Sequence, residues 1–353
     1  MAIGRIVIAL DGMGGDLAPG SVVGGVALAL EKYPDTDFLI YGDSQRLMPM
    51  VEANKSFSGR VTVVHSPSSI AADAKPAVAL RTGRDSSMRM AIDAVHDGKA
   101  SAVVSGGNTG ALMAMALFVL RPLPGIERPA ITSVLPTRKG DVVMLDLGAN
   151  LEVDSDNLIQ FSIMGSAFAT AILGRRNPTI GLLNVGSEDT KGKDSIREAA
   201  RVLKNATGQP WKFHGFVEGD DITAGTTDVV VTDGFTGNVA LKTAEGVGKL
   251  YIDFLRRIFE SGSLMSKLGY LLAKPAFRTL KERLDPRRYN GGVFLGLQGI
   301  CVKSHGGTDA LGYANAIGVA HDLVKHGCNE TIKTELAQLS TLFGSGLEEQ
   351  GAS

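Results

Sequence analysis

The sequence predicts an α/β protein built on a doubly wound, mostly parallel sheet with helices on both faces. Two observations predict this fold class. Short apolar runs rich in β-branched residues recur along the chain, and each ends in glycine or in a polar turn. Segments with helical periodicity lie between most of these runs. Such alternation is typical of sheets in which a helix returns the chain to the start of the next parallel strand.

The apolar runs give the predicted strands in chain order. They are Arg5–Leu10, Phe38–Tyr41, Val61–His65, Ala102–Ser105, Ala130–Leu135, Val142–Leu147, Thr179–Asn184 and Val229–Thr232. Only the short turn 136–141 separates the fifth of these strands from the sixth. A connection of this length permits an antiparallel hairpin but no crossover helix, so we expect a mixed sheet.

The helical patterns between the strands give the predicted helices. They are Ser21–Lys32, Ser86–Asp97, Thr109–Leu120, Asn157–Leu173 and Asp194–Asn205. The stretch 240–284 differs, because it is a long helical pattern broken at Ser261–Ser263 and at Pro275. We expect one large α/β domain over residues 1–340, with a basic and apolar helical projection at about residues 245–288.

Composition narrows the function classes. The chain has 353 residues and a formal net charge of −1, which does not favour a general nucleic-acid binder. The longest apolar run, 111–120, is about half as long as a transmembrane span of ~20 residues. The first residues lack a secretory signal pattern, so we expect a cytoplasmic protein that does not span a membrane. Cys301 and Cys328 lie far apart without a metal-ligand motif, which predicts two free thiols and no metal site.

Several familiar motifs are incomplete or missing. The stretch from Ile8 to Gly20 joins an apolar run to glycines, but Leu17 stands where a dinucleotide fingerprint needs its third glycine. Asp11 and Asp16 flank this loop, and their carboxylates would repel a pyrophosphate. The chain also lacks a Walker loop, a G-x-S-x-G nucleophile elbow and an H-E-x-x-H zinc motif. We therefore expect no cofactor, no metal and no covalent serine intermediate.

Three strand-to-helix loops are rich in donors for an anion. They are 105–110 (SGGNTG), 184–192 (NVGSEDTKG) and 232–242 (TDGFTGNVALK). Free backbone amides at a helix N-terminus favour phosphate-sized anions, and hydroxyl groups and lysines add to this. Each loop alone is more often a plain turn. In a wound sheet all three are expected at the carboxyl edge of the strands, where ligands bind, so together they predict an anion site.

Residues 256–288 combine basic and apolar side chains. They hold nine Lys or Arg and three Asp or Glu, a net charge of +6, so the rest of the chain carries −7 (−1 minus +6). Leucines at 264, 268, 271 and 272 share one helical stripe. A dimer interface with a basic rim, an interfacial membrane helix and a dock for an acidic protein all need this combination. The sequence leaves these three interpretations open.

A longer series of stretches is specific to one family. The stretches are DGMGGD (11–16), SGGNTG (105–110), MLDLGAN (144–150), LNVGSEDTKG (183–192), FVEG (216–219), VVTDGFTGNVALK (230–242), YNGGVFLG (289–296) and SHG (304–306). The matching part of the chain as a whole extends from residue 3 to about residue 326. With these residues the chain resembles the bacterial phosphate acyltransferase family of phospholipid synthesis. The resemblance implies a three-layer α/β fold like that of isopropylmalate dehydrogenase, used without nicotinamide. It also implies a cytoplasmic homodimer in loose, peripheral contact with the inner face of the membrane.

The resemblance also implies an activity and its partners. The family moves a long-chain acyl group from the thioester of acyl carrier protein to inorganic phosphate. The acyl phosphate then supplies a downstream, membrane-bound acyltransferase. An acidic carrier protein would account for the basic segment 256–288. Nucleic acid is not expected as a partner.

Under this resemblance, phosphate is itself the nucleophile, and the protein has to hold it, align it and stabilise the developing oxyanion. The expected catalytic residues are Lys191, Asn238, Lys242 and His305. The expected substrate-binding residues are Gly106, Gly107, Asn108, Thr109, Asn184, Ser187, Asp233 and Thr236. The expected contacts to carrier protein or membrane are Leu264, Leu268, Leu271, Leu272, Lys274, Arg278 and Lys281.

Two of these assignments keep an alternative at this point. His305 is a candidate acid for the departing thiolate, but a structural hydrogen-bonding histidine fits the sequence equally well. Asp11 or Asp16 is expected to orient a lysine such as Lys191 or to cap a helix. For the function as a whole, the nearest alternative is a phosphotransacetylase-like enzyme that uses acyl-coenzyme A. An oxidoreductase on the same fold and a scaffold without enzymatic activity are further alternatives.

Overall fold

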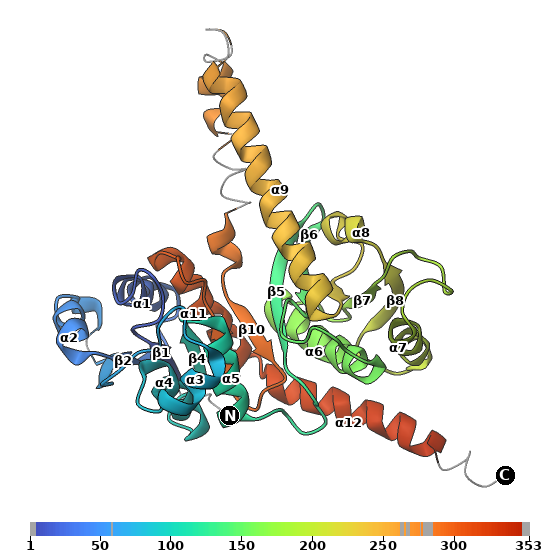
Figure 1. Cartoon of the computed structure of the whole chain (residues 1–353), viewed down its shortest axis with the longest axis horizontal. Helices are drawn as coiled ribbons and strands as arrows, with labels where there is room; N and C mark the ends of the chain where they lie inside the picture. The colour runs from blue at the N-terminus through green and yellow to red at the C-terminus, as the bar shows by residue number, and fades with distance from the viewer. Residues whose placement is uncertain are drawn as a thin grey trace.

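A single mixed sheet of eleven strands runs through the protein (Figure 1). The computed structural model describes residues 5–57, 59–261, 265, 269–275, 277 and 285–347. The strands are β1 (Ile6–Asp11), β2 (Thr36–Gly42), β3 (Val61–His65), β4 (Ala102–Ser105), β5 (Ala130–Thr137), β6 (Gly140–Leu145), β7 (Thr179–Leu183), β8 (Lys212–Val217), β9 (Val229–Val231), β10 (Gly292–Leu295) and β11 (Ile300–Lys303). Their order across the sheet is β3-β2-β1-β4-β11-β10-β5-β6-β9-β7-β8.

The sheet consists of two parallel parts that run in opposite directions. Strands β3, β2, β1, β4 and β11 are parallel to one another, and so are β6, β9, β7 and β8. Between these parts, β10 is antiparallel to both β11 and β5, and β5 and β6 form the expected antiparallel hairpin. The predicted mixed, mostly parallel sheet is confirmed.

Helices cover both faces of this sheet and complete three layers. The helices are α1 (Gly20–Lys32), α2 (Ser44–Glu52), α3 (Pro76–Thr82), α4 (Ser87–His96), α5 (Thr109–Leu120), α6 (Ser155–Leu173), α7 (Asp194–Asn205), α8 (Gly219–Ala224), α9 (Gly234–Ser261), α11 (Ala310–Lys325) and α12 (Cys328–Leu347), with 3-10 turns η1 (Lys55–Phe57) and η2 (Pro286–Tyr289). One apolar core joins the sheet to α1, α6, α7, α11 and α12. Two others lie under α3, α4 and α5 and under α8 and the start of α9.

Side-chain caps explain why several helices begin where they do. The Asn108 side chain accepts a hydrogen bond from the Ala111 amide at 2.8 Å and caps α5. Asp154 caps α6 in the same way, and Ser86 caps α4. Such caps satisfy amides that the first helical turn leaves without partners. Because α5 begins directly after the 105–108 turn, its cap also fixes the shape of one of the predicted anion loops.

The clearest sequence patterns match the structure closely. The segments β3, β4, α5 and α7 have the predicted bounds, and the remaining predicted elements agree to within a few residues. Strands β8, β10 and β11 were not predicted. Strands β10 and β11 are only four residues long; β10 lies between Gly291 and Gly296, and β11 follows Gly299, so neither has a clear period-two pattern.

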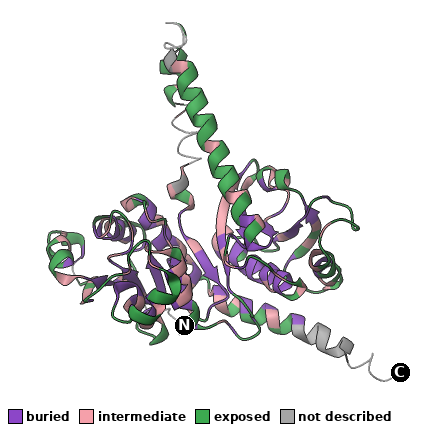
Figure 2. Ribbon diagram, in the orientation of Figure 1, coloured by how far each residue is buried: buried purple, intermediate pink, exposed green. Residues whose placement is uncertain are grey.

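Helix α9 leaves the body of the protein and projects into solvent (Figure 1). Exposed residues line most of its length beyond residue 241 (Figure 2). The chain returns to the body at η2. Within the described parts of the chain, no helix combines the length and the apolarity that a membrane crossing needs. Leu264, Leu268, Arg278 and Lys281 lie outside the described residues.

Candidate functional site

The predicted site residues fall into two groups of loops. The first loop cluster consists of residues 11–16, 105–109 and 304–309, which follow β1, β4 and β11. The second loop cluster consists of residues 146–150, 184–193 and 232–238, which follow β6, β7 and β9. The expectation that all three anion loops share one carboxyl edge is wrong, because β4 is antiparallel to β7 and β9. The reversals at β10 and at the β5–β6 hairpin cause this difference.

Asp11 lies at the buried base of the first loop cluster and anchors it. Its carboxylate is buried and accepts hydrogen bonds from the hydroxyl groups of Ser87, at 2.6 Å, and Ser105, at 2.7 Å. Burial raises the pKa of this carboxyl, and the hydrogen bonds act in the opposite direction. Gly14 packs against the next loop, where a Cβ would lie 2.7 Å from the Gly107 nitrogen. Asp11 is thus a structural anchor, and the loop is a close backbone contact rather than a nucleotide cradle.

Lys303 ends β11 inside this cluster and was not among the predicted site residues. Its ammonium group donates to the Gly106 carbonyl at 3.3 Å and to the Ser304 carbonyl. Burial lowers the pKa of Lys303 to about 8, although the charges of Asp11 and Asp16 favour the cation. The sequence offered one signal for this role, a lysine that directly follows an apolar run. Its role depends on the Gly106 loop, which is remote in the sequence.

His305 is exposed, but its backbone is firmly held. The buried Asn290 side chain accepts from the His305 amide at 2.8 Å and donates to Ser304 Oγ at 2.8 Å and to the Gly312 carbonyl at 2.7 Å. The Gly307 amide donates to His305 Nδ1 at 3.2 Å. With Nδ1 as an acceptor, a neutral imidazole carries its proton on Nε2, which can donate a hydrogen bond to a ligand.

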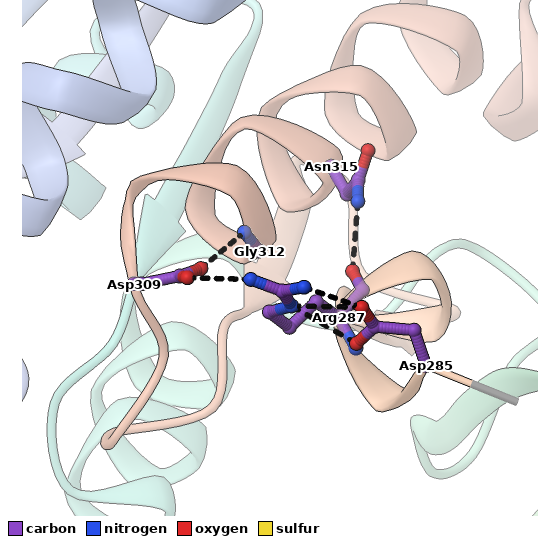
Figure 3. A network of polar contacts seen from close by, with 5 residues as sticks. All are labelled: Asp285, Arg287, Asp309, Gly312 and Asn315. Atoms are coloured by element: carbon purple, nitrogen blue, oxygen red, sulfur yellow. Dashed lines mark hydrogen bonds and ion pairs between the residues drawn. The ribbon is translucent and has the colours of Figure 1, made fainter. Parts of the chain in front are cut away.

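A salt-bridge network supports the same loop from outside (Figure 3). The Arg287 guanidinium donates to both carboxylate oxygens of Asp285 and, at 2.8 Å, to Asp309 Oδ2. Asp309 Oδ1 accepts from the Gly312 amide and caps α11. The Asn315 side chain donates to the Arg287 carbonyl at 2.8 Å. The chain returning from the projection is therefore tied to the 304–309 loop and to the start of α11.

Asp146 has the corresponding anchoring role in the second loop cluster. Its buried carboxylate accepts from the backbone amides of Ile131, Gly148, Ala149 and Asn150 at 2.7–3.1 Å. The Asn150 side chain adds a further hydrogen bond at 2.9 Å. Burial raises the pKa of Asp146, and these hydrogen bonds oppose that shift. With its oxygens so fully used, Asp146 shapes the loop rather than reacting.

Asn184 and Lys191 lie together in the loop after β7. The Asn184 side chain donates to the carbonyls of Gly186, at 3.2 Å, and Lys191, at 3.1 Å, so it fixes the turn from inside. Lys191 and Ser187 are exposed on its outer side. Lys191 pairs with Glu188 at 2.7 Å, and this hydrogen bond raises its pKa and keeps it cationic. The expectation that Asp11 or Asp16 orients Lys191 is wrong, because Glu188 holds it instead.

The loop after β9 supplies the remaining predicted residues. Asp233 accepts from the amide and the hydroxyl of Thr236, at 2.7 and 3.0 Å, and from Lys193 at 3.3 Å. Asn238 is exposed on the first turn of α9 and lies beside Gly148. In the described part of the chain its side chain has no hydrogen-bond partner. Lys242, one turn further, pairs with Glu245 at 2.9 Å.

The second loop cluster therefore gathers six of the twelve predicted catalytic and substrate-binding residues around an exposed surface, and a seventh, Lys242, lies one helical turn beyond it on α9. The hollow beside Lys193, Thr232 and Asp233 holds about 10 Å³, which is room for roughly one water molecule. An anion would therefore have to bind on the outer side, among the exposed Lys191, Ser187 and Asn238. The other five, Gly106 to Thr109 and His305, lie in the first loop cluster. In the described residues, no group of three or more His, Cys, Asp or Glu is placed to hold a metal ion.

The fold is shared with enzymes of two kinds. A phosphotransacetylase from Streptococcus pyogenes matches with a TM-score of 0.64 at 15% identity, over 91% of this chain and 94% of that one. The 4-hydroxythreonine-4-phosphate dehydrogenase from Klebsiella pneumoniae matches with a TM-score of 0.53 at 16% identity, over 91% and 99% of the two chains. At such identities the likeness concerns the fold, and it confirms the expected three-layer α/β class.

Sequence comparison gives the family. Residues 6–331 match the model of a family described as fatty acid synthesis protein. A phosphate acyltransferase from Rhodospirillum centenum is 62% identical over 335 residues, which are 95% of this chain and 94% of the relative. A phosphate acyltransferase from Rhodospirillum rubrum is 54% identical over 337 residues, or 96% of each chain. The chain belongs to the fatty acid synthesis protein family, and the resemblance to phosphate acyltransferases is confirmed.

Proposed function

We infer that the chain is a phosphate acyltransferase, which moves a long-chain acyl group from acyl carrier protein to inorganic phosphate for phospholipid synthesis. The observation that carries this function is the 62% identity, over nearly the whole of both chains, to a protein of that name. The structural neighbours are far more distant, at 14–16% identity, and they contribute the fold alone.

The reaction needs no nucleophile from the protein. A phosphate oxygen forms a bond to the thioester carbonyl carbon, the carbon–sulfur bond breaks, and the departing thiolate takes up a proton. The thiols of Cys301 and Cys328 are buried, and burial raises the pKa of both, to about 12 for Cys328. A buried, protonated thiol is a poor nucleophile, so these residues do not suit covalent catalysis.

The second loop cluster is the proposed reaction site. Lys191 and Ser187 supply a cation and a hydroxyl for phosphate, and their exposure leaves room for it. The Asn238 amide group, which has no partner among the described residues, is available to donate to the developing oxyanion. Lys242 is a second cation on the same face of α9, one helical turn away. Asn184, Asp233 and Thr236 hold the loops that carry these groups.

The first loop cluster is proposed as the opposite wall of the site. Five steps of strand order separate β4 from β9. At roughly 20–25° of twist for each step, the strands turn by about 100–125° over this distance. Two carboxyl edges that are opposite in a flat sheet therefore turn toward one side of the molecule. A hydrogen bond from His305 Nε2 would then stabilise the leaving thiolate, which takes up the proton that the attacking hydrogen phosphate loses. The amides of Gly106, Asn108 and Thr109 would face the phosphate, while the Gly107 amide donates to Ser105 Oγ.

The projection is proposed to bind a second copy of the chain and the surface of the membrane. Val247, Leu250, Tyr251, Phe254 and Ile258 are 44–65% exposed, and their spacing places them on one stripe of α9. Such a stripe fits the equivalent helix of a homodimer. Beyond this stripe, Met265, Leu271 and Leu272 are 62–76% exposed near Lys274. Apolar and basic side chains together suit a helix that lies on the cytoplasmic surface of a membrane. Replacing Leu250 and Phe254 with Glu should give a monomer by analytical ultracentrifugation; a persistent dimer would exclude this stripe as the interface.

The nearest alternative substrate is acyl-coenzyme A. Parallel assays with acyl carrier protein and acyl-coenzyme A thioesters, each with and without phosphate, decide between them. We expect phosphate-dependent turnover with the carrier thioester and a much lower kcat/KM with the coenzyme A thioester. The opposite preference would support the phosphotransacetylase-like alternative.

A further inference from the structure

A groove between α3, α4 and α5 lies outside the proposed reaction site. Its volume is about 510 Å³, and its lining residues are Ala77, Leu80, Arg81, Arg84, Asp85, Arg89, Asp93 and Phe118. We propose that this groove is the docking surface for the acidic body of the acyl carrier protein. This inference rests on the proposed function, because it assigns a place to the protein that carries the acyl group.

The charges of the groove leave an excess of arginine. Arg89 is paired with Asp93 at 2.8 Å, which holds its guanidinium in one place. Arg81 and Arg84 are exposed, and neither has a hydrogen-bond or ion-pair partner in the part of the chain that the structure describes. These two cations outnumber the remaining carboxylate, Asp85. Arginine in this setting offers a planar set of donors that matches carboxylates, which an acidic protein surface supplies.

The groove also presents an aromatic anchor. The Phe118 side chain is 62% exposed, and the Arg89 guanidinium lies 5.7 Å from its ring centroid. Ala77 and Leu80 add apolar surface to the lining of the groove. Arginine and aromatic side chains are enriched at protein interfaces, and burial of an exposed aromatic ring contributes to binding. A soluble partner with acidic and apolar groups on one helix is the chemistry that this surface fits.

The groove adjoins the first loop cluster. Ser87, between the lining residues Asp85 and Arg89, donates to Asp11 at 2.6 Å. The Met88 side chain lies under Gly107, and Asn108 donates to the carbonyls of Ala72 and Ala74 just before α3. A carrier protein bears its thioester on a prosthetic arm, so its body can dock beside the site while the thioester enters it.

The projection is the competing location for the carrier. Within its described residues, Arg287 is held by Asp285 and Asp309, and Arg257 also has an interaction partner. The apolar stripe of α9 suits a helix of a second copy. Arg256, Lys274 and Arg288 have no partner among the described residues, as is also true of Arg81 and Arg84. The groove differs from the projection because it combines its cations with the exposed Phe118 ring and lies next to the loops of the proposed site.

The test compares two charge reversals of equal size. Arg81→Glu with Arg84→Glu changes the groove, and Arg201→Glu with Lys204→Glu makes the same change on the exposed face of α7. Binding of unacylated carrier protein is measured by fluorescence anisotropy, and KM is measured for acyl carrier protein, for phosphate and for an acyl-pantetheine thioester without a protein body. Phe118→Ala is a second groove variant that leaves the charge unchanged.

We expect the groove reversal to weaken carrier binding and raise the KM for acyl carrier protein by roughly tenfold or more. The KM for phosphate and the kcat/KM for acyl-pantetheine should stay unchanged, and the α7 variant should resemble the wild type. Equal effects of the two reversals, or an effect only from Arg256→Glu with Lys274→Glu on the projection, would overturn the proposal. If the carrier binds wild type but not the groove variant, and wild type forms no acyl phosphate, the docking surface stands while the proposed function fails.

Discussion

Arg287 donates from Nη1 to Asp309 Oδ2 at 2.8 Å, and this contact joins the segment returning from the projection to the N-terminus of α11. We expect Arg287→Met to lower the free energy of unfolding only slightly, because the ion pair is partly exposed and screened by solvent. Asp309→Ala should cost more, because it also removes the α11 cap. Urea denaturation of the two variants and of the double variant measures this; strictly additive losses would mean that the two side chains do not interact.

The same contact has a consequence for acid stability. The hydrogen bond from the Gly312 amide, together with Arg287, lowers the pKa of Asp309. A carboxyl with a lowered pKa in the folded state stabilises the protein above its ordinary pKa of about 4, and the stabilisation is lost as the pH falls through the folded-state pKa. The Asp309→Ala difference should therefore shrink below about pH 4.

We expect Asn290 to affect catalysis through His305, because the Asn290 side chain accepts a hydrogen bond from the His305 amide. Asn290→Asp keeps the shape of the side chain but replaces its donor to the Gly312 carbonyl with an acceptor, so the 304–309 loop should shift. We expect kcat to fall by about tenfold or more. In the His305→Gln background the same change should cost much less, because the group that Asn290 positions is already gone.

A purely structural role for Asn290 gives a different result. It would lower kcat by the same factor in both backgrounds and would appear chiefly as a lower melting temperature. Ser304→Ala is the matched control. It removes another partner of the Asn290 side-chain amide and leaves the hydrogen bond to the His305 amide in place.

The lowered pKa of Lys303 predicts that the free energy of unfolding rises at alkaline pH. Its pKa is about 8 in the folded protein and near 10.5 when exposed, so the unfolded chain binds more protons between these values. The free energy of unfolding should therefore increase as the pH rises from about 8 to about 10.5, by at most on the order of 3 kcal/mol from this group. Lys303→Met should remove the increase. Denaturant midpoints at pH 7, 8, 9 and 10 test this, and parallel pH curves for the two proteins would refute it.

The second loop cluster is tested by Lys191→Ala and Asn238→Ala. Each should lower kcat/KM by roughly 10²–10³, by analogy with the loss of one oxyanion donor. Both residues are exposed, so the free energy of unfolding should stay close to that of the wild type. Lys204→Ala, an exposed lysine on α7, is the control. Near-wild-type turnover in either variant would remove that residue from the site.

Local sequence patterns predicted the strands and helices well, because their signals are contained in a few neighbouring residues. Helix α5, for example, is bounded by the capping Asn108 and by an apolar run that ends at Leu120. The separation of the loops into two clusters could not be predicted, since it depends on β10 and β11. These strands are short and glycine-flanked, and they pair with β4 and β5, which are remote in sequence.

The roles of the buried polar residues could not be predicted from the sequence either. Asn290 lies within a stretch that carries the family resemblance and Lys303 directly precedes another, but only their partners identify what they do. Lys303 contacts Gly106, 197 residues away, and the Asn290 amide joins Ser304, after β11, to Gly312 in the first turn of α11. Conversely, Lys191 was placed in the correct loop, but Glu188, three residues away, is its partner rather than an aspartate of the first strand.

The most direct test of the account is to follow the reaction of acyl carrier protein with inorganic phosphate by phosphorus NMR. The account predicts an acyl phosphate signal that grows with the release of one thiol for each acyl phosphate, and no loss of thioester when phosphate is omitted. Thiol release without a new phosphorus signal, or at the same rate without phosphate, would contradict acyl transfer to phosphate.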